Sequence, residues 1–319
     1  MKAGAPMPRN ERPEMLFAFP GYQQLASAFQ SITNLELHEF SIARYCNQEM
    51  HAVIPTHLAG ERCFILGSIA PPDEQFISFS LLSHTLREQG AGQITAILPY
   101  LAYARQDKFK EGESLAAAWA GSLLKASGVD RILTVDIHSE RDEQLFQVPL
   151  ISLSPASLFA KEIHGRGLTD ATIVAPDHGA VRRCQAVRAA AGLPPAETPY
   201  FEKKRTDHGV VHSGFIGKTC SRVILIDDML DTGGTLISAC EKLGSIGVDE
   251  IYIFVTHGLF TGEGWRQLWS LNVKHISCTN TIPPSAATLT DNNISILSMA
   301  PLLRDALIQL ETGVPSCTR

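Results

Sequence analysis

The sequence has no segment that predicts export or membrane insertion, and it has little positive charge. No apolar run approaches the about 20 residues that a membrane-spanning helix needs. Residues 1–13 are polar and lack the apolar stretch of a signal peptide, so we expect them to form a short flexible tail. Lys and Arg number 27 against 33 Asp and Glu, a net charge of −6, which disfavours a nucleic-acid partner. These absences favour a cytoplasmic protein that binds neither membranes nor nucleic acid.

Paired cysteines are also missing. The chain has seven cysteines, at positions 46, 63, 184, 220, 240, 278 and 317. They form no Cys-x-x-Cys pair and no Cys/His cluster at zinc spacing. Scattered thiols in odd number are typical of a reduced, cytosolic protein. We therefore expect neither a disulfide framework nor a structural zinc site.

What the sequence does contain is a regular alternation of strand-like and helix-like segments. Short apolar runs predict strands at 16–19, 63–67, 94–99, 131–135, 172–175, 223–226 and 251–255. Helices are predicted at 76–89, 114–127, 180–191 and 234–245. Near-continuous apolar strands that alternate with helices indicate parallel sheets covered on both faces. The predicted fold class is therefore α/β.

The chain length and a sequence pattern that occurs in both halves predict two domains. A chain of 319 residues, 45% hydrophobic and 19% charged, suits a globular protein with two cores of ordinary size. Residues 132–136 and 173–177 share one pattern, an apolar strand that ends in an acid. We place the boundary near 152–157, which gives an N-terminal domain at 14–153 and a C-terminal domain at 154–319.

The strongest local signal is an apolar strand that runs into acids, a glycine turn and a helix. Its polar residues are Asp227, Asp228, Asp231, Thr232, Gly233, Gly234 and Thr235. The turn can direct backbone N–H groups and two hydroxyls at a phosphate, and the helix N-terminus adds its positive dipole end. The paired acids suit ribose hydroxyls or a divalent cation. Taken alone, Asp231 or Thr232 could be an ordinary helix cap.

The whole string resembles the binding motif for phosphoribosyl diphosphate (PRPP) that type I phosphoribosyltransferases and PRPP synthetases share. The motif by itself does not separate these two groups. Gly217-Lys218-Thr219 is not the end of a Walker A loop, because position 212, where that loop needs glycine, is His212. Any ATP must therefore be held in another way.

Two segments resemble the nucleotide-binding parts of PRPP synthetases specifically. One is the run at 99–108, and its ATP-binding residues by resemblance are Arg105, Gln106 and Asp107. Arg105 offers a guanidinium fork to phosphate, and Gln106 can read a base edge or a ribose. The other is 45–49, which resembles an adenine-contacting hairpin with Tyr45, Asn47 and Glu49. In the family this hairpin reaches the ATP of a neighbouring subunit, which implies a homo-oligomer, at least a dimer with a shared adenine site.

Two further segments resemble the family's metal and diphosphate sites. Residues 134–139 match the segment with a metal-linked histidine, so the resemblance implies that His138 and Asp177 hold Mg²⁺, directly or through water. Since Mg²⁺ prefers oxygen ligands, Asp177 ranks above His138. The loop that cradles the transferred diphosphate would consist of Asp177, His178, Gly179 and Ala180. The family usually has a second glycine where this chain has Ala180, and an alanine there needs a permitted backbone conformation.

Residues 202–205 match the family's mobile catalytic loop. Carried over by position, Lys203 and Arg205 are the catalytic cations, and Lys204 fills the variable place between them. The alternative for this segment is a basic surface turn.

The resemblance covers residues 15–312 and carries expectations for fold and activity. It implies two tandem type I phosphoribosyltransferase-like domains, with ATP on the N-terminal side and ribose 5-phosphate on the C-terminal side. The expected reaction transfers the β,γ-diphosphate of Mg-ATP to O1 of ribose 5-phosphate and releases AMP. Two alternatives stay open: a catalytically silent regulatory subunit of the same family, and a phosphoribosyltransferase that consumes PRPP.

The segment at 109–115 departs from the family's phosphate-activated, ADP-inhibited class and looks more like its archaeal-type class. Glu111 and Glu113 occupy a region that helps to bind an anionic effector in the ADP-inhibited class, and like charge disfavours phosphate or ADP there. We therefore expect weak or absent allosteric inhibition by ADP.

Overall fold

The computed structural model describes residues 14–54, 58, 60–137, 139, 141–206 and 209–312, and for 203–206, 209–213, 311 and 312 it describes the backbone alone. The predicted tail at 1–13 lies outside these residues. The chain divides into two compact units. The N-terminal unit runs to Leu153 and also includes the last helix from Ala300, and the C-terminal unit spans Ser154–Met299.

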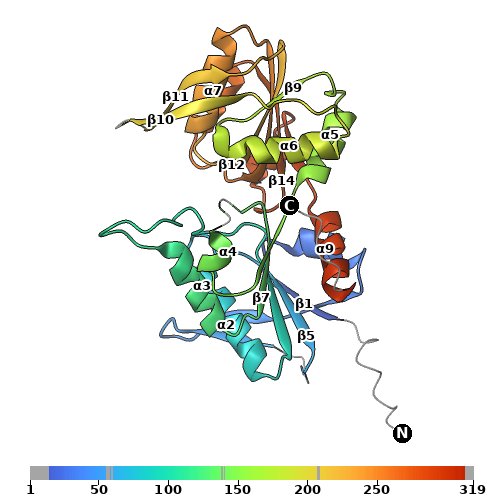
Figure 1. The fold of residues 1–319 in the computed structure, drawn as a ribbon. Coiled ribbons are helices and arrows are strands. Elements are labelled where there is room, and N and C mark those ends of the chain that lie inside the picture. Colours follow the sequence, from blue (N-terminus) through green and yellow to red (C-terminus); the bar gives the residue numbers. More distant parts are fainter. Residues whose placement is uncertain are drawn as a thin grey trace. The chain divides into compact units, whose positions relative to one another are not determined.

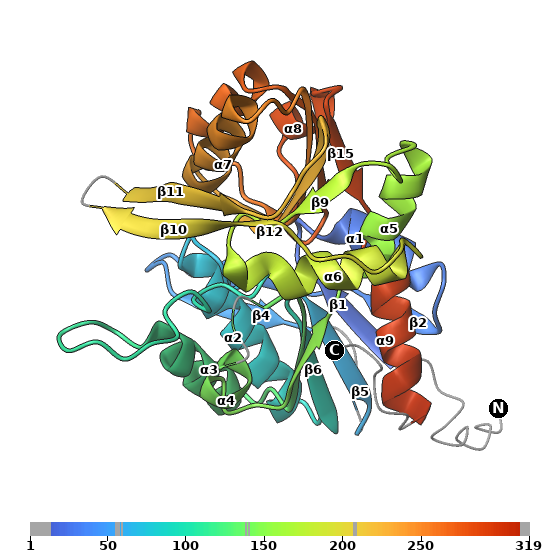
Figure 2. The ribbon, with the colours of Figure 1, turned by 45° about the horizontal axis from the view of Figure 1, so that its top comes forward.

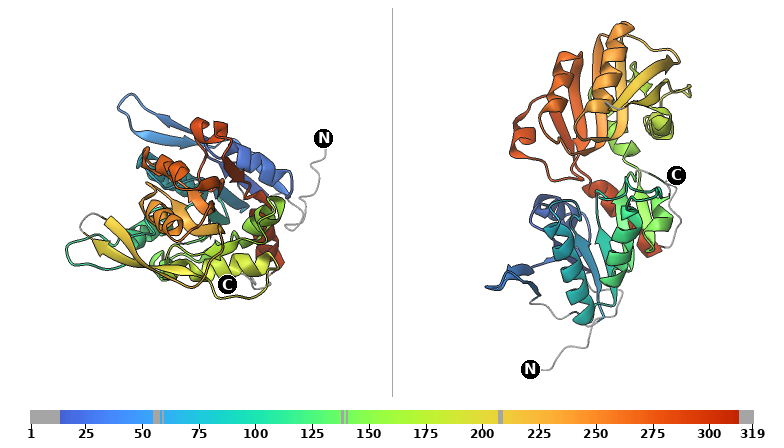
Figure 3. Two further views of the ribbon diagram at one scale, coloured as in Figure 1. Left: turned by 90° about the horizontal axis from the view of Figure 1, so that it is seen from above. Right: turned by 90° about the vertical axis from the view of Figure 1, so that its left-hand side faces the viewer.

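The N-terminal unit is built on a six-stranded parallel sheet. Its strands are β1 (Glu14–Ala18), β2 (Leu35–His38), β5 (Arg62–Leu66), β6 (Gln93–Ile97), β7 (Arg131–Val135) and β8 (Leu150–Leu153). The spatial order is β2-β1-β5-β6-β7-β8, and every neighbouring pair is parallel. A separate antiparallel hairpin, β3 (Ser41–Arg44) and β4 (Met50–Val53), stands out from this unit (Figure 3).

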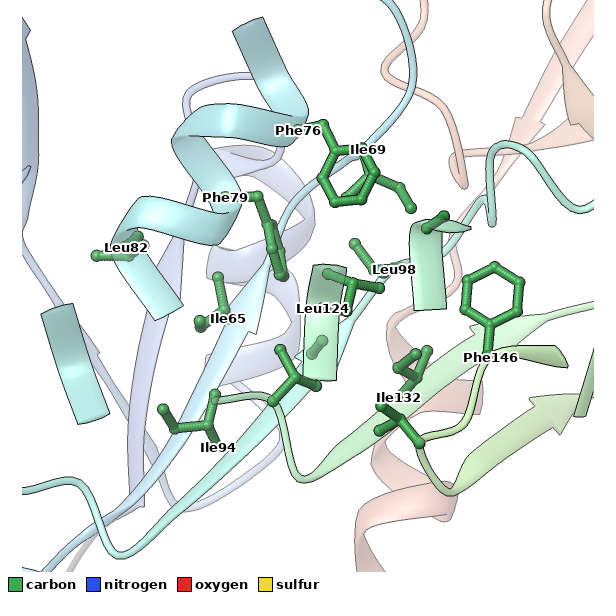
Figure 4. Packing of buried hydrophobic residues seen from close by; sticks show 14 of the residues in the cluster. Ile65, Ile69, Phe76, Phe79, Leu82, Ile94, Leu98, Leu124, Ile132 and Phe146 are labelled. Carbon is green, nitrogen blue, oxygen red and sulfur yellow. The ribbon is translucent and has the colours of Figure 1, made fainter. Parts of the chain in front are cut away.

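Helices cover both faces of this sheet (Figure 1). They are α1 (Gln23–Gln30), α2 (Glu74–Glu88), α3 (Ala116–Ala126), α4 (Asp142–Leu145) and α9 (Ala300–Thr312). Phe79 of α2 and Leu124 of α3 are fully buried against Ile65, Ile94 and Ile132 of the strands (Figure 4). This is the packing that apolar strands and one-sided apolar helices require.

Helix α9 lies in the N-terminal unit, although its sequence follows the whole C-terminal unit. The division between Leu153 and Ser154 falls where the sequence places the boundary, but the expected C-terminal domain at 154–319 included this helix. Leu303, Ala306 and Leu307 of α9 are buried, and the helix packs beside α1 (Figure 1). The assignment of α9 therefore differs from the expectation because its apolar face is covered within the N-terminal unit.

The C-terminal unit repeats the same architecture. Its parallel strands are β9 (Thr172–Val174), β12 (Arg222–Leu230), β13 (Glu250–Gly258), β14 (Val273–Thr279) and β15 (Ile294–Leu297), in the order β15-β14-β13-β12-β9. Its helices are α5 (Ala156–Gly165), α6 (Val181–Ala190), α7 (Gly234–Ser245) and α8 (Ala286–Thr290), with short 3-10 helices η2 (His178–Ala180) and η3 (Gly264–Ser270). A long antiparallel hairpin, β10 (Tyr200–Thr206) and β11 (Gly209–Ile216), extends from the unit (Figure 2).

Alternation along β12 supplies both cores of this unit. Val223 and Leu225 pack with α7 on one face, and Ile224 and Ile226 pack with α5 and α6 on the other. The prediction of parallel sheets covered on both faces is confirmed in both units. None of the helices in the described part of the chain is long and apolar enough to cross a membrane.

Candidate active site

The predicted ATP-binding residues of the 99–108 run follow β6 at its carboxyl end. Ligands of open parallel sheets bind at this edge. Arg105 and Gln106 are exposed and Asp107 is half-buried. The segment is anchored on both sides, because Ala104 is buried and the backbone N–H of Ala117 in α3 donates to the Gln106 carbonyl (3.4 Å).

The other predicted nucleotide-contacting residues lie at the tip of hairpin β3–β4. Tyr45, Asn47 and Glu49 are exposed, and the backbone N–H of Tyr45 donates to the Glu49 carbonyl (2.9 Å). The Asn47 Oδ1 accepts the N–H of Glu49 (3.2 Å). Residues 45–49 thus join two antiparallel strands, and their contact with adenine stays a prediction.

Two side chains that the sequence did not single out support this tip. The Arg44 guanidinium donates to the Gln48 carbonyl (2.6 Å) and to the Glu74 carboxylate at the start of α2 (2.7 Å). The ring of His51 stacks on Tyr45, with centroids 4.3 Å apart and planes 23° apart. Tyr45 remains 57% exposed, so the stack leaves part of its ring available to a planar ligand.

A cavity of about 790 Å³ lies beside this hairpin. Its lining includes Phe19, Gln23, Phe40, Ile42, Arg44 and Glu74. Its lining includes none of the predicted nucleotide-contacting residues, although it includes Arg44, next to Tyr45.

In the C-terminal unit the predicted diphosphate loop connects β9 to α6. Asp177 has an extended backbone and caps the 3-10 turn, because its Oδ1 accepts the N–H of Ala180 (3.0 Å). The ring of His178 meets that of Tyr200 edge-on at 5.3 Å.

Ala180 fits this loop without strain. Its φ of −82° and ψ of −6° lie in the right-handed region, which any L-residue adopts. The side chain is buried in the core between α6 and the sheet. The alanine in place of the family's glycine therefore adds its methyl group to the core.

The predicted ribose 5-phosphate residues occupy the end of β12 and the turn into α7. The strand is longer than predicted: it continues past Ile226 through Asp227 and Asp228 to Leu230, because β13 pairs with it as far as Gly258. Asp228 is buried and Asp227 is half-buried. The two acids therefore sit within a paired strand, where their backbone positions are fixed.

The turn places two adjacent glycines in different surroundings. Gly233 has a φ of +92°, and a Cβ there would lie 2.8 Å from the Cα of Trp265, so only glycine fits. A Cβ on Gly234 would meet open space. No side-chain cap is bonded at the start of α7. A helix N-terminus that follows a glycine turn, with open space beside Gly234, suits an anion such as phosphate.

Two observations, the strand register and the charges that act on one buried thiol, indicate that the diphosphate loop lies close to the end of β12. Strand β9 pairs with β12 up to Val174 and Leu225, so Asp177 and Asp227 both follow the same edge of the sheet. Both carboxylates act on the buried Cys184 of α6. Burial is the largest cause that raises the pKa of this thiol; Arg183 opposes it, whereas Asp227 and Asp177 add to it.

The predicted catalytic cations Lys203 and Arg205 lie on β10, opposite His212 and Val210 of β11. A β-bulge interrupts the pairing between Glu202 and Lys203. The hairpin begins beside the diphosphate loop. The N–H of Ala175, two residues before that loop, donates to the carbonyl of Pro199, the residue before β10 (2.9 Å). The segment read as a loop is thus an extended ribbon in its backbone.

The predicted metal residue His138 lies outside the described residues, between Ile137 and Ser139. Within the described ranges, no group of three or more His, Cys, Asp or Glu side chains could hold a metal ion. Magnesium in nucleotide sites commonly uses one or two carboxylates together with substrate phosphates. The carboxylate of Asp177 fits that chemistry.

The strand ends next to β12 are tied together by buried hydroxyls. The Thr279 and Thr281 hydroxyls donate to the Thr256 carbonyl (2.6 and 3.0 Å), and His257 Nδ1 lies 3.0 Å from Thr281 Oγ1. These contacts fix the carboxyl end of β13, which pairs with β12, to that of β14 on its other side.

The two parallel α/β units and the strand–turn–helix element at β12–α7 define a protein of the phosphoribosyltransferase-like class. Two family models agree with this class. The N-terminal domain of ribose phosphate pyrophosphokinase matches residues 15–128, and the phosphoribosyl synthetase-associated domain matches residues 171–314.

Whole-chain relatives narrow the class to one family. The chain is 31% identical over 301 residues to the ribose-phosphate pyrophosphokinase of Rhizobium meliloti, covering 92% of this chain and 95% of that one. It is 30% identical over 289 residues to the one from Cereibacter sphaeroides, covering 88% and 84%. The crystal structure of phosphoribosylpyrophosphate synthetase from Mycobacterium smegmatis is similar, with a TM-score of 0.82 and 28% identity over 95% of this chain and 100% of that one. The chain belongs to the ribose-phosphate pyrophosphokinase family.

Proposed function

We propose that this protein transfers the β,γ-diphosphate of Mg-ATP to O1 of ribose 5-phosphate. The observation that carries the proposal is the strand–turn–helix element of β12 and α7 next to the Asp177 loop, in a chain of this family. The O1 hydroxyl attacks the β-phosphorus, the bond from that phosphorus to the α–β bridging oxygen breaks, and AMP leaves with this oxygen. The hydroxyl proton goes to solvent, and PRPP is the other product.

The C-terminal unit binds the acceptor in this proposal. The 5-phosphate lies on the turn that consists of Asp231, Thr232, Gly233, Gly234 and Thr235. Asp227 and Asp228 accept hydrogen bonds from the ribose hydroxyls or hold a second cation. The diphosphate loop at 177–180 faces the same edge of the sheet, which brings the acceptor and the transferred group together.

Charge neutralisation drives the chemical step. Phosphoryl-type transfer spreads negative charge over the phosphate oxygens, so fixed cations stabilise its transition state. Lys203 and Arg205 on the β10–β11 hairpin supply this charge and exclude water. Asp177, and His138 beyond the described residues, hold Mg²⁺, which supplies Lewis-acid stabilisation of the phosphate oxygens when bound.

The N-terminal unit binds the donor nucleotide. Arg105 binds phosphate, while Gln106 and Asp107 bind the base or ribose. Tyr45, Asn47 and Glu49 contact the adenine of a neighbouring copy, so the working enzyme is at least a dimer. The exposed Tyr45 ring, supported from behind by His51, is suited to stacking on a purine.

The test is product analysis of purified protein with ATP, ribose 5-phosphate and Mg²⁺ by phosphorus NMR. We expect AMP and PRPP in equal amounts, and neither product when ribose 5-phosphate is omitted. A folded sample that binds ribose 5-phosphate but turns over no nucleoside triphosphate would instead be the regulatory subunit. PRPP consumption with a nucleobase, in the absence of ATP, would indicate a phosphoribosyltransferase.

A further inference from the structure

Tyr103, directly before the predicted ATP-binding residues, has an unusual backbone conformation. Its φ is +69°, in the left-handed region that bulky L-residues rarely adopt. Such a conformation persists only where the surroundings enforce it, and it often occurs at functional sites. The contacts of Tyr103 therefore indicate what the conformation serves.

An aromatic cluster holds the Tyr103 ring. The ring centroid lies 5.9 Å from that of Phe76 on α2 and 5.4 Å from that of Trp119 on α3, edge-on to the latter at 77°. Phe76 and Trp119 also meet each other edge-on at 5.4 Å. Phe76 is buried, whereas Trp119 is 50% exposed. We call these three residues the aromatic anchor; it joins the first turns of two helices to the loop.

The phenol adds a polar contact to the anchor. The Tyr103 hydroxyl lies 3.4 Å from Asp73 Oδ1, at the residue that precedes α2. Burial and the Asp73 charge both raise the pKa of Tyr103, so the phenol keeps its proton and donates to the carboxylate. The side chain is thus fixed by its ring and by its hydroxyl.

The conformation of Tyr103 sets the positions of the next three residues. Its carbonyl accepts the N–H of Gln106 (3.1 Å), which closes a turn with Ala104 and Arg105 at its centre. Ala104 is buried, and Arg105 is turned outward and exposed. The Ser114 hydroxyl then donates to Gln106 Oε1 (2.8 Å). Tyr103 at one end and Ser114 at the other therefore orient the side chains predicted to meet ATP.

We propose that Tyr103 is a positioning residue for the nucleoside triphosphate, held in its strained conformation by Phe76 and Trp119. The anchor orders Arg105 and Gln106 before the nucleotide arrives, so binding costs less conformational entropy. The proposal rests on the proposed function, because it takes the segment after Tyr103 as the site for ATP. It adds Tyr103, Phe76 and Trp119, which do not themselves touch the nucleotide.

Steady-state kinetics separate positioning from simple packing. Tyr103→Ala and Trp119→Ala should raise KM for ATP roughly tenfold, since each removes two of the three aromatic pairs and the order that they impose. KM for ribose 5-phosphate should stay within about twofold, because that substrate is bound by the other unit. Tyr103→Phe keeps the ring and loses only the bond to Asp73, so it should rescue most of the ATP affinity. Leu123→Ala is the matched control, one turn along α3 from Trp119 and 38% exposed.

Calorimetric titration with α,β-methylene ATP, in which carbon replaces the oxygen of the bond that breaks, measures the same effect without turnover. The expected result is weaker binding by Tyr103→Ala and Trp119→Ala, with wild-type binding by Leu123→Ala. Unchanged affinity in Trp119→Ala, or equal losses for both substrates, would overturn the positioning role. If Tyr103→Ala does not fold, Tyr103→Phe and Trp119→Ala still decide the question. A wild-type protein that binds the analogue but makes no AMP refutes the proposed function alone.

Discussion

At the scale of single residues, Gly233 and Gly234 are neighbours with different requirements. Gly233→Ala forces an alanine into the left-handed region and its Cβ against Trp265, so we expect a loss of about 1–3 kcal/mol in the free energy of unfolding. Gly234→Ala should leave that stability nearly unchanged, because its Cβ meets open space. Urea unfolding of both variants measures the difference.

Ligand affinity should follow a different order in the same two variants. The methyl group of Gly234→Ala enters the space where we place the 5-phosphate, so KM for ribose 5-phosphate should rise although the protein stays stable. Full affinity in Gly234→Ala would move the phosphate away from the start of α7.

Lys203 provides the sharpest test of the chemical step. Lys203→Ala should lower kcat by roughly 10²–10³, the loss of about 3–4 kcal/mol that follows removal of a transition-state contact. KM should change far less, because the contact is made chiefly in the transition state. Lys218→Ala, an exposed lysine just after β11, is the control and should leave kcat unchanged. An unaltered kcat in Lys203→Ala would remove Lys203 from the mechanism.

At the scale of elements, a partly buried polar network joins the C-terminal end of α5 to β14 and β15. The Arg166 guanidinium pairs with Glu162 and donates to His275 Nε2 (2.6 Å) and to the Ser295 hydroxyl (2.7 Å). The Ser277 hydroxyl donates to Glu162 (2.9 Å). Burial and the Arg166 charge lower the pKa of His275 from 6.5 to about 4, against smaller opposing effects of Glu162 and Asp291.

This network should make the free energy of unfolding depend on pH. His275 is neutral in the folded protein down to about pH 4, whereas the unfolded chain protonates it below about pH 6.5. Its contribution is therefore complete above pH 6.5 and decreases as the pH falls from 6.5 towards 4. Urea unfolding at pH 7 and pH 4.5 should show a smaller decrease in His275→Gln than in the wild type. Equal decreases in both proteins would place the acid sensitivity elsewhere.

The sequence predicts elements well where buried positions are marked by a clear pattern of apolar residues. The strand at 131–135 and the helix at 234–245 have the predicted bounds, because apolar side chains fill the first and a glycine turn precedes the second. Strand β12 was predicted too short, since its last residues include Asp227 and Asp228 and only backbone pairing with β13 continues it. The β10–β11 hairpin was missed for the same reason: the basic run at 202–205 has no apolar alternation.

For the candidate site, too, some features can be predicted from the sequence and others cannot. The resemblance singled out residues that lie close together along the chain at strand ends, and their roles stay predictions. It could not find His51 under Tyr45 or Trp119 beside Tyr103, because these contacts join separate elements. Nor could the sequence alone establish that Ala180 has a right-handed backbone conformation.

At the scale of the whole molecule, regulation should differ from that of the ADP-inhibited class. Glu111 and Glu113 are exposed on the loop after β6, and Lys110 lies 3.0 Å from Glu113 in an ion pair. Lys110 offsets the charge of Glu113, so Glu111 is the carboxylate that would repel an anionic effector. We expect ADP to inhibit only by competition with ATP, with hyperbolic curves at every ATP concentration. A sigmoidal ADP curve that ATP does not relieve would contradict this expectation.

The position of α9 has a consequence for synthesis of the chain. The N-terminal unit needs a helix whose residues begin at Ala300, about 150 residues after the rest of that unit ends at Leu153. While the ribosome makes the C-terminal unit, the apolar surface of α1 that α9 later covers has no partner from its own unit. The first unit to emerge is therefore the last to be completed, and a nascent chain released early would expose that surface to aggregation or to a chaperone.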